Sequence, residues 1–178
     1  MSLDEALAGK EIPSEIRESL ALLALPYHSF TGEVCEGQLV VHASVAEETR
    51  EIFNTLFAKQ FPIAKMVPVV VYGWDDDASM ADNNTSAFNY RLIYGTDRLS
   101  NHSYGRAIDV NPLQNPYVRR DGVVVPAGAA YDTTVPGTIT AKVADLFRSR
   151  GWVWGGDWTD RKDWQHFEKA ETQNKVQP

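Results

Sequence analysis

Two short polar stretches constrain how this chain can fold. One is SNHSYGRAIDVNP, which begins at Ser100, and the other is DWQHFE, which begins at Asp163 near the C-terminus. The first supplies the imidazole of His102 and the carboxylate of Asp109, and the second adds a carboxylate at Asp163 and an imidazole at His166. Two imidazoles and one carboxylate can hold a zinc ion with one position left for water, and the remaining carboxylate can serve as a base. A fold that uses this chemistry must bring the two stretches together.

Length and composition are those of an ordinary globular protein. The chain has 178 residues, of which 43% are hydrophobic and 23% are charged, and this length suits a single domain over residues 1–178. The net charge of −7 argues against a nucleic-acid surface, which usually carries a basic patch. Cys35 is the only cysteine, which excludes an internal disulfide and a multi-cysteine zinc site. A metal in this chain must therefore use histidine and carboxylate ligands.

The sequence gives no sign of membrane insertion or of a signal peptide. No run approaches the roughly 18 apolar residues of a membrane span. The N-terminal sequence MSLDEALAGKEIP lacks a basic region followed by an apolar run. Two alternatives for localisation remain open. The protein stays in the cytoplasm until another route releases it, or an export signal has been removed from this sequence.

Local patterns predict both helices and strands. The spacing of apolar residues predicts one helix over Ile16–Leu23 and another over Val143–Phe147, which Gly151 ends. A capping box at 44–47 predicts a third helix that continues to about Gln60. Strands are predicted at Gln38–Ala43 and Val67–Tyr72. A further strand, which runs into a glycine turn, is predicted at Trp152–Trp158.

The remaining segments separate these elements. Residues 1–12 are predicted to be a loose lead-in, and the polar residues 74–85 a long loop. Asp121-Gly122 lies between short runs that favour a hairpin. The strands and helices follow one another too irregularly for a parallel βαβ sheet. The pattern predicts an α+β fold with a small, mainly antiparallel sheet flanked by helices.

The two polar stretches can form one site if their chains are extended. Gly105 lets the backbone turn between His102 and Asp109. Side chains then alternate, so that Asp109 lies on the face opposite two core-type residues. In the second stretch, His166 lies within the strand, whereas Asp163 must reach the same place from the turn before it, because an odd offset within a strand points away.

Each of these residues also has a simpler interpretation. A single histidine is more often a surface or core residue, and an aspartate before a helix or strand is more often a cap. The helical HExxH zinc signature is absent from the chain. Asp75–Asp77 lacks the twelve-residue pattern of a calcium loop and is predicted to be a solvated acidic loop. Spacing alone leaves both a metal site and ordinary polar contacts open.

Together, the two stretches resemble one known family. SNHSYGRAID resembles the SxHxxGxAxD motif of the D-alanyl-D-alanine carboxypeptidase/dipeptidase group of zinc peptidases, relatives of VanY-type enzymes and of phage L-alanyl-D-glutamate endopeptidases. GGDWTDRKDWQHFE resembles the closing pattern of that group, an acidic residue three positions before a histidine that is followed by Phe-Glu. The similarity also includes AFNYR and NPLQNPYV, so it spans roughly residues 67–168.

The resemblance implies a role for each matching residue. His102, Asp109 and His166 would bind one zinc ion, and Asp163 would take a proton from the water that the zinc holds. Many members of the group have glutamate where this chain has Asp163. Aspartate is shorter, so base and metal must lie closer together, and this variant looks more like the endopeptidase branch.

Two further residues match positions with roles at the substrate. Arg91 resembles the arginine that contacts the substrate carbonyl and stabilises the developing oxyanion. Ser100, the first residue of the motif, is a candidate for binding the substrate or supporting a zinc ligand. The tryptophans of Trp152–Trp158 and Trp164 fit either the wall of a substrate groove or a packed corner of the core.

The resemblance also implies a fold and a function. The fold would be like that of hedgehog and the DD-peptidases. The protein would be a zinc metallopeptidase that hydrolyses an amide bond in the stem peptides of bacterial peptidoglycan, as a D-alanyl-D-alanine carboxypeptidase or as an L-alanyl-D-glutamate endopeptidase. It would act as a monomer in the cell wall, in the periplasm or after secretion.

Other functions remain as alternatives. The signalling domain of hedgehog resembles this fold and shows that a zinc site can stabilise a binding module without catalysis. A metal-free domain is a third interpretation, in which the same residues make polar core contacts. Asp163 and Arg91 favour the enzyme, because neither is needed merely to hold a metal.

Overall fold

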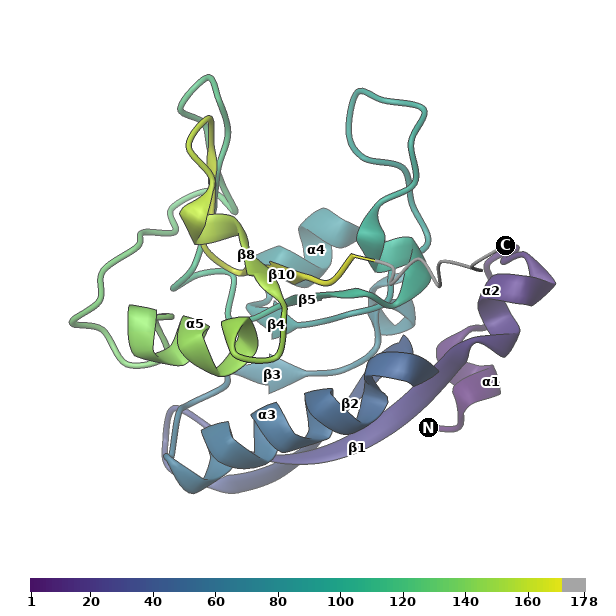
Figure 1. Ribbon diagram of the computed structural model, residues 1–178, viewed down its shortest axis with the longest axis horizontal. Helices are drawn as coiled ribbons and strands as arrows, with labels where there is room; N and C mark the ends of the chain where they lie inside the picture. Colours follow the sequence, from purple (N-terminus) through teal and green to yellow (C-terminus); the bar gives the residue numbers. More distant parts are fainter. Residues whose placement is uncertain (171–178) are drawn as a thin grey trace, which may run out of the picture.

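A computed structural model describes residues 1–170 of the protein (Figure 1). Residues 171–178 of the predicted domain lie outside the described residues. The α-helices are α1 (Leu3–Ala6), α2 (Ser14–Glu18), α3 (Ala46–Ala58), α4 (Asp76–Ala81) and α5 (Ala141–Arg148), and the 3-10 turns are η1 (Ala43–Val45), η2 (Val69–Tyr72), η3 (Asn101–Tyr104) and η4 (Gly155–Asp157). The strands are β1 (Leu20–His28), β2 (Val34–His42), β3 (Lys65–Met66), β4 (Asn84–Thr85), β5 (Ala107–Asp109), β6 (Tyr117–Val118), β7 (Val124–Val125), β8 (Val153–Trp154), β9 (Lys162–Asp163) and β10 (His166–Glu168).

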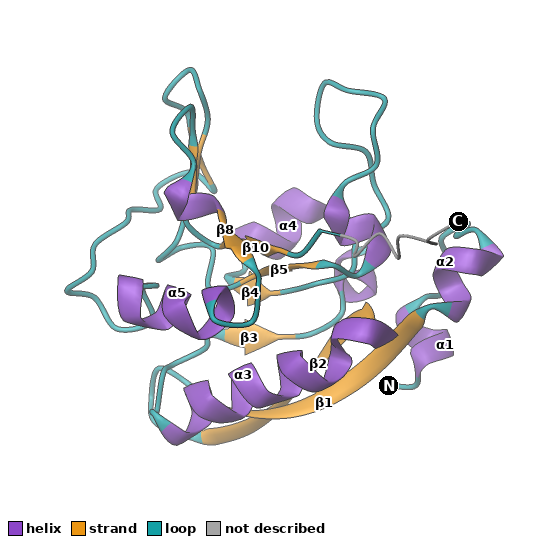
Figure 2. Cartoon of the chain, in the orientation of Figure 1, coloured by secondary structure: helices purple, strands orange, loops and turns teal. Residues whose placement is uncertain are grey.

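Within the described residues, the strands form four small sheets (Figure 2). β1 pairs with β2, β10 lies between β5 and β8, and β6 lies between β7 and β9, all antiparallel. β3 and β4 are parallel. The predicted α+β class with mainly antiparallel pairing is confirmed, although the strands are divided among several sheets instead of one.

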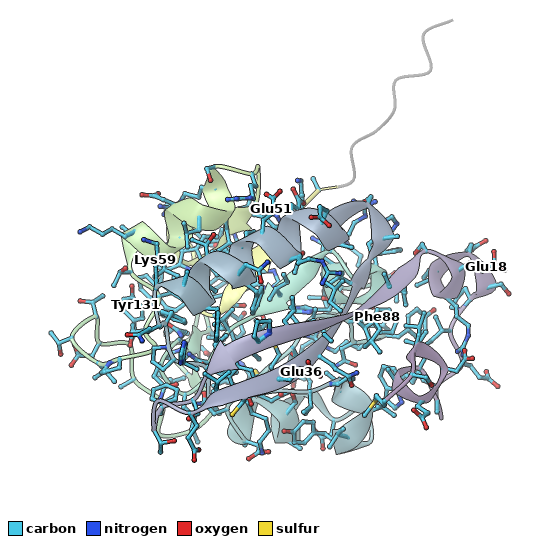
Figure 3. All side chains as sticks on the ribbon, turned by 90° about the horizontal axis from the view of Figure 1, so that it is seen from below. Glu18, Glu36, Glu51, Lys59, Phe88 and Tyr131 are labelled. Carbon is cyan, nitrogen blue, oxygen red and sulfur yellow. The ribbon has the colours of Figure 1, made fainter. Side chains whose placement is uncertain are left out.

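The long β1–β2 ribbon and α3 form the base of the molecule. Alternate residues of the ribbon, such as Leu25 and Leu39, are buried against Ile52 and Phe53 of α3 in the main core cluster. The predicted helix that ends near Gln60 is thus confirmed. Seen from below in Figure 3, α3 lies across this ribbon, with Glu51 on its exposed surface.

A second layer places the polar stretches above this base. α5 packs on the sheet of β5, β10 and β8, where the rings of Phe147 and Phe167 stack with their centroids 3.7 Å apart. Ile108 of β5 and Phe167 of β10 are neighbours in the antiparallel pairing, and both are fully buried. Because side chains alternate along a strand, the neighbouring pair Asp109 and His166 points to the opposite face. The core thereby fixes the direction of two candidate ligands.

Two raised segments border that opposite face. One consists of the loop between β4 and β5, and the other of the β6–β7 hairpin together with the chain between β8 and β9; Figure 1 shows both projecting on the same side of the molecule. The hairpin confirms the prediction at Asp121-Gly122, since Arg119 N–H donates to the carbonyl of Val123 across the turn. The predicted helix stop at Gly151 is also confirmed, since its φ is 80° just after α5.

The predicted loose lead-in over residues 1–12 is wrong. A capping box between Ser2 and Glu5 opens α1, and Ala6 and Leu7 are each only 1% exposed. They belong to a second apolar cluster with Phe88. The apolar residues at the start of this segment are too few to show helical periodicity, so only packing reveals their role.

Several predicted elements differ in type. The predicted helix over Ile16–Leu23 ends at Glu18, and β1 begins at Leu20, because pairing with β2 outweighs the helical spacing. The predicted strand Val67–Tyr72 is mostly the 3-10 turn η2, which follows Pro68. Residues 74–85 contain α4 rather than one long loop, since the side chain of Asp75 caps its first turn.

The predicted capping box at Ser44 is also wrong. The backbone N–H of Ser44 donates to His42 Nδ1, which caps the 3-10 turn η1, and α3 then begins at Ala46 without a side-chain cap. Among the described residues, no helix is both long and apolar enough to cross a membrane.

Candidate metal centre

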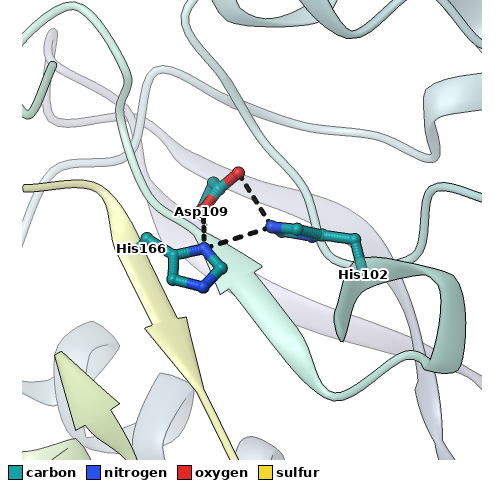
Figure 4. A group of neighbouring side chains, drawn as sticks. All are labelled: His102, Asp109 and His166. Carbon is teal, nitrogen blue, oxygen red and sulfur yellow. Dashed lines mark hydrogen bonds and ion pairs between the residues drawn. The ribbon is translucent and has the colours of Figure 1, made fainter. Parts of the chain in front are cut away.

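The structure brings His102, Asp109 and His166 together (Figure 4). His166 Nδ1 lies 2.9 Å from Asp109 Oδ1, His102 Nε2 lies 3.1 Å from Asp109 Oδ2, and the two ring nitrogens are 3.2 Å apart. All three side chains are buried. One potential ligand atom from each lies within 4.8 Å of the others, a group that could hold a metal ion.

Local sequence fixes the position of His102. Ser100 Oγ accepts a hydrogen bond from the backbone N–H of His102 at 3.3 Å, which caps the turn η3. Gly105 ends that turn with a φ of 65°, a conformation that favours glycine. A Cβ at Gly105 would lie 2.5 Å from the backbone nitrogen of His42, so the turn fits closely against β2. Both residues of the motif therefore hold the histidine in place.

The outer nitrogen of each histidine also has a partner. His102 Nδ1 contacts the carbonyl oxygen of Ala87, and His166 Nε2 lies 3.1 Å from Glu168 Oε2. Glu168 Oε2 in turn accepts a hydrogen bond of 2.7 Å from Asn101 Nδ2. Histidines that bind metals usually donate their outer N–H to a carbonyl or carboxylate in this way, which fixes the ring and its tautomer.

These contacts test whether the residues fit a metal. If each outer nitrogen carries its proton, the inner nitrogens of His102 and His166 direct lone pairs at the same point beside the Asp109 carboxylate. Two buried lone pairs at 3.2 Å need a shared cation or proton between them. Two nitrogens and one carboxylate oxygen form a donor set that suits zinc. The group fits a divalent metal.

In the metal-free protein, this group binds a proton. Burial alone would lower the pKa of His166, but hydrogen bonds with Asp109 and Glu168 outweigh it and raise that pKa to about 10. Burial likewise opposes ionisation of Asp109, yet the neighbouring His102 and His166 hold the pKa of its carboxyl well below its usual range. The hydrogen bond with His166 lowers the pKa of Glu168 to about 2. A metal that enters must displace the proton.

Asp163 lies on β9, in a different sheet from His166. Its Oδ1 is buried without a hydrogen-bond partner among the described residues. Burial raises the pKa of its carboxyl to about 7, and the charge of Asp109 adds to this while His166 opposes it. A Cβ at Gly155 would lie 2.5 Å from the carbonyl oxygen of Asp163, so the glycine turn after β8 allows β9 to come this close. Asp163 ends β9, separated from β10 by two residues, and lines the same groove as the three candidate ligands.

A groove of about 920 Å³ opens above these residues. Its lining includes the three candidate ligands together with Asp163, Arg91 and Ser100. The guanidinium of Arg91 is ion-paired with Asp76 at 2.9 Å, and its backbone N–H donates to Ser103 Oγ. The structure thus gathers all six predicted site residues in one groove, with Arg91 directed to Asp76 and Ser100 to the backbone of η3.

Several residues at the site are not evident from sequence reasoning. Glu168 and Asn101 support His166, and alternation along β10 is the one signal for Glu168, since it shares a face with His166. The tryptophans fit both predicted roles, since some pack in the core and another lines the groove. Trp154 is in the core, whereas Trp158 lines the groove with its ring centroid 5.5 Å from that of His166.

Comparison with known proteins finds a family match over the segment that holds the candidate metal centre. A family model described as D-alanyl-D-alanine carboxypeptidase matches residues 94–169, which include Asp163 and the three candidate ligands but not Arg91. No match was found to a curated protein or to a solved structure, so the likeness to the hedgehog fold stays a prediction. The family resemblance is confirmed for the segment that holds the candidate metal centre, which matches the D-alanyl-D-alanine carboxypeptidase family.

Proposed function

We propose that this protein is a zinc-dependent peptidase that hydrolyses an amide bond in the stem peptides of peptidoglycan. One observation carries the proposal: His102, Asp109 and His166 converge, buried, where they line an open groove, and each histidine is oriented by a second contact. These three residues would hold a zinc ion, and catalytic zinc sites typically have three protein ligands, with the remaining position taken by water or substrate. The family match supports a peptidase and a peptidoglycan substrate.

The metal we propose is zinc, with one ion bound per protein molecule. Imidazole nitrogen and carboxylate oxygen ligands in this number suit zinc better than magnesium or calcium, which prefer sites made of oxygen. When bound, zinc polarises a carbonyl group and lowers the pKa of a water to about 7. The remaining chemistry falls to the side chains of the groove.

Asp163 is the proposed proton carrier. Its Oδ1 has no partner among the described residues, so it is free to accept a proton from the attacking water. Burial raises the pKa of this carboxyl to about 7 in the metal-free protein, and a carboxyl whose neutral form is favoured in this way can hold the proton and pass it to the leaving amine. Its carboxyl lines the same groove as the three candidate ligands.

Arg91 is the proposed donor to the substrate carbonyl. It lines the groove, and its ion pair with Asp76 holds the guanidinium on the wall. A fixed cation there would stabilise negative charge that develops on the carbonyl oxygen. Ser100 has a different role in this proposal: its hydroxyl holds the backbone of His102 and so positions a ligand.

The test is digestion of purified muropeptides by the zinc-loaded protein, with and without chelator, followed by mass analysis of the products. Chelator-sensitive loss of one terminal alanine would make it a carboxypeptidase. Release of the peptide beyond L-alanine would make it an L-alanyl-D-glutamate endopeptidase. No cleavage by protein that holds stoichiometric zinc would contradict the proposal and favour a zinc-stabilised binding module.

A further inference from the structure

One cation of the groove lies near the candidate metal centre without a full set of partners. Arg161 lines the groove, and its guanidinium carbon lies 4.2 Å from the centre of the Trp158 ring. The Trp158 ring in turn lies 5.5 Å from the ring of His166. The two distances together place the guanidinium within about 10 Å of the His166 ring. Trp158 therefore lies in contact with Arg161 on one side and near the His166 ring on the other.

The donor edge of Arg161 is available for a ligand. Among the described residues, its hydrogen bonds use Nη1 alone, which donates to Asp160 at 3.0 and 3.2 Å. Nε and Nη2, which form the side edge of the guanidinium, have no partner among the described residues. Two parallel N–H donors on one edge match the two oxygens of a carboxylate.

The charges around Arg161 leave it only partly neutralised. Its partner Asp160 is shared with Arg120, whose Nε donates to the same carboxylate at 2.9 Å. Two guanidinium groups thus face one carboxylate on this wall. An anionic group of a substrate would therefore be drawn to the Arg161 wall.

The other arginines of the groove are less suited to this task. Arg91 is ion-paired with Asp76, and the side edge of Arg120 is already used by Asp160. The guanidinium of Arg119 lies over the ring of Tyr94, which is 88% exposed. Arg98 lies on the opposite raised segment.

We propose that Arg161 binds a carboxylate of the peptide substrate within about two residues of the bond that is cleaved, and this rests on the proposed function. An extended residue spans about 3.3–3.6 Å. A carboxylate one or two residues away from the cleaved bond is therefore within reach of the Arg161 guanidinium, which lies within about 10 Å of the His166 ring. Two sources share this chemistry: the C-terminal carboxylate of the peptide and the free carboxylate of its glutamyl residue. Arg161 is thus a specificity-determining residue that selects an anionic peptide.

The test measures binding apart from turnover. Zinc-loaded full-length protein with the substitution Asp163→Asn is titrated calorimetrically with a synthetic stem pentapeptide and with two analogues, each having one of the two carboxylates converted to an amide. We expect one amide to weaken binding about tenfold or more, as for loss of a charge-assisted bidentate contact. Adding Arg161→Gln should weaken binding of the parent peptide by a similar factor and remove the sensitivity to that amide.

Controls separate this contact from general effects. Arg98→Gln, a groove arginine on the opposite wall, should retain the sensitivity, and Arg161→Lys should retain part of it because it keeps the charge without the fork. Sensitivity to the C-terminal amide identifies a terminal carboxylate, and sensitivity to the glutamyl amide identifies the side carboxylate. Full sensitivity in both Arg161 variants, equal binding of all three peptides or no binding would overturn the proposal.

The outcome is independent of catalysis. If the protein without substitutions cleaves no peptide but binds with a carboxylate preference that depends on Arg161, the proposed function fails and the role of Arg161 stands. If it cleaves the parent peptide and Arg161→Gln leaves the carboxylate preference intact, the proposed function stands and the role of Arg161 fails. A thermal melt of each variant confirms that it is folded before titration.

Discussion

Asp163 and His166 are three residues apart, yet the structure gives them different surroundings. His166 Nδ1 faces Asp109 and His102, whereas Asp163 Oδ1 faces no partner among the described residues. The first arrangement suits a ligand and the second suits a base. Replacement of each residue should therefore have a different effect on metal content.

Asp163→Asn should retain zinc and lose most activity. Asparagine keeps the shape of aspartate but cannot accept the proton, and loss of a general base typically lowers kcat by about 10²–10⁴-fold. His166→Ala should lose both zinc and activity. Zinc stoichiometry by atomic absorption and steady-state kinetics check both variants, and full zinc content with full activity in His166→Ala would contradict the ligand assignment.

Zinc affinity should fall as the pH falls. Hydrogen bonds raise the pKa of His166 to about 10 in the metal-free protein, so this ring is protonated at neutral pH. Zinc binds only the neutral nitrogen, so each binding event releases that proton. The dissociation constant should rise about tenfold for each unit of pH lost between pH 8 and pH 6. Competition titrations against a chelator of known affinity measure it, and a constant that does not change with pH would contradict this account.

At the scale of elements, glycines set how closely the turns approach their neighbours. Gly105 has a φ of 65°, and a Cβ there would lie 2.5 Å from the backbone of β2. Gly122 has a φ of 82°, but no atom of residues 1–170 lies within 4 Å of the position that a Cβ would take. Substitution of either glycine would introduce backbone strain, but only substitution of Gly105 would also introduce a steric clash, so a comparison of the two distinguishes these effects.

Gly105→Ala should be the more destabilising of two matched substitutions. Gly122→Ala bears only the strain of a left-handed conformation, about 1 kcal/mol of unfolding free energy. Gly105→Ala adds a clash with backbone that cannot move freely, for a total of about 3 kcal/mol or more. Urea denaturation of the metal-free proteins gives both values. Equal destabilisation would show that η3 does not fit tightly against β2.

The sequence predicts the site better than it predicts the elements around it. The alternation around Asp109 and the two motifs identify residues that the structure gathers in one groove, because each signal depends on neighbouring residues only. The predicted helix extends too far, through Leu20 to Leu23, because the apolar spacing there fits a helix while pairing with β2 makes these residues a strand. The ion pair of Arg91 with Asp76 and the contact of Trp158 with His166 depend on tertiary packing, which local patterns do not contain.

At the scale of the whole molecule, a metal at this centre would join separate parts of the fold. His102 belongs to η3, Asp109 to β5 and His166 to β10, so one ion would link elements that are otherwise held by small sheets. Binding to the folded state alone raises its stability by mass action. The stability of the molecule should therefore depend on zinc.

Zinc at one hundred times its dissociation constant should stabilise the protein by about 2.7 kcal/mol. For a chain of this length, that corresponds to a rise in Tm of about 5–10 °C. Differential scanning calorimetry with and without a chelator measures the shift, and His166→Ala is the control that should show none. An equal shift in that variant would mean that zinc stabilises the protein at another place.

The most direct test of the central claim is the anomalous diffraction signal at the zinc edge from crystals of the zinc-loaded protein. The account predicts one peak bonded to His102 Nε2, His166 Nδ1 and a carboxylate oxygen of Asp109, at about 2.0–2.2 Å, with its remaining position open to the groove. A peak at other residues, or none at the three ligands in protein that holds stoichiometric zinc, would contradict it.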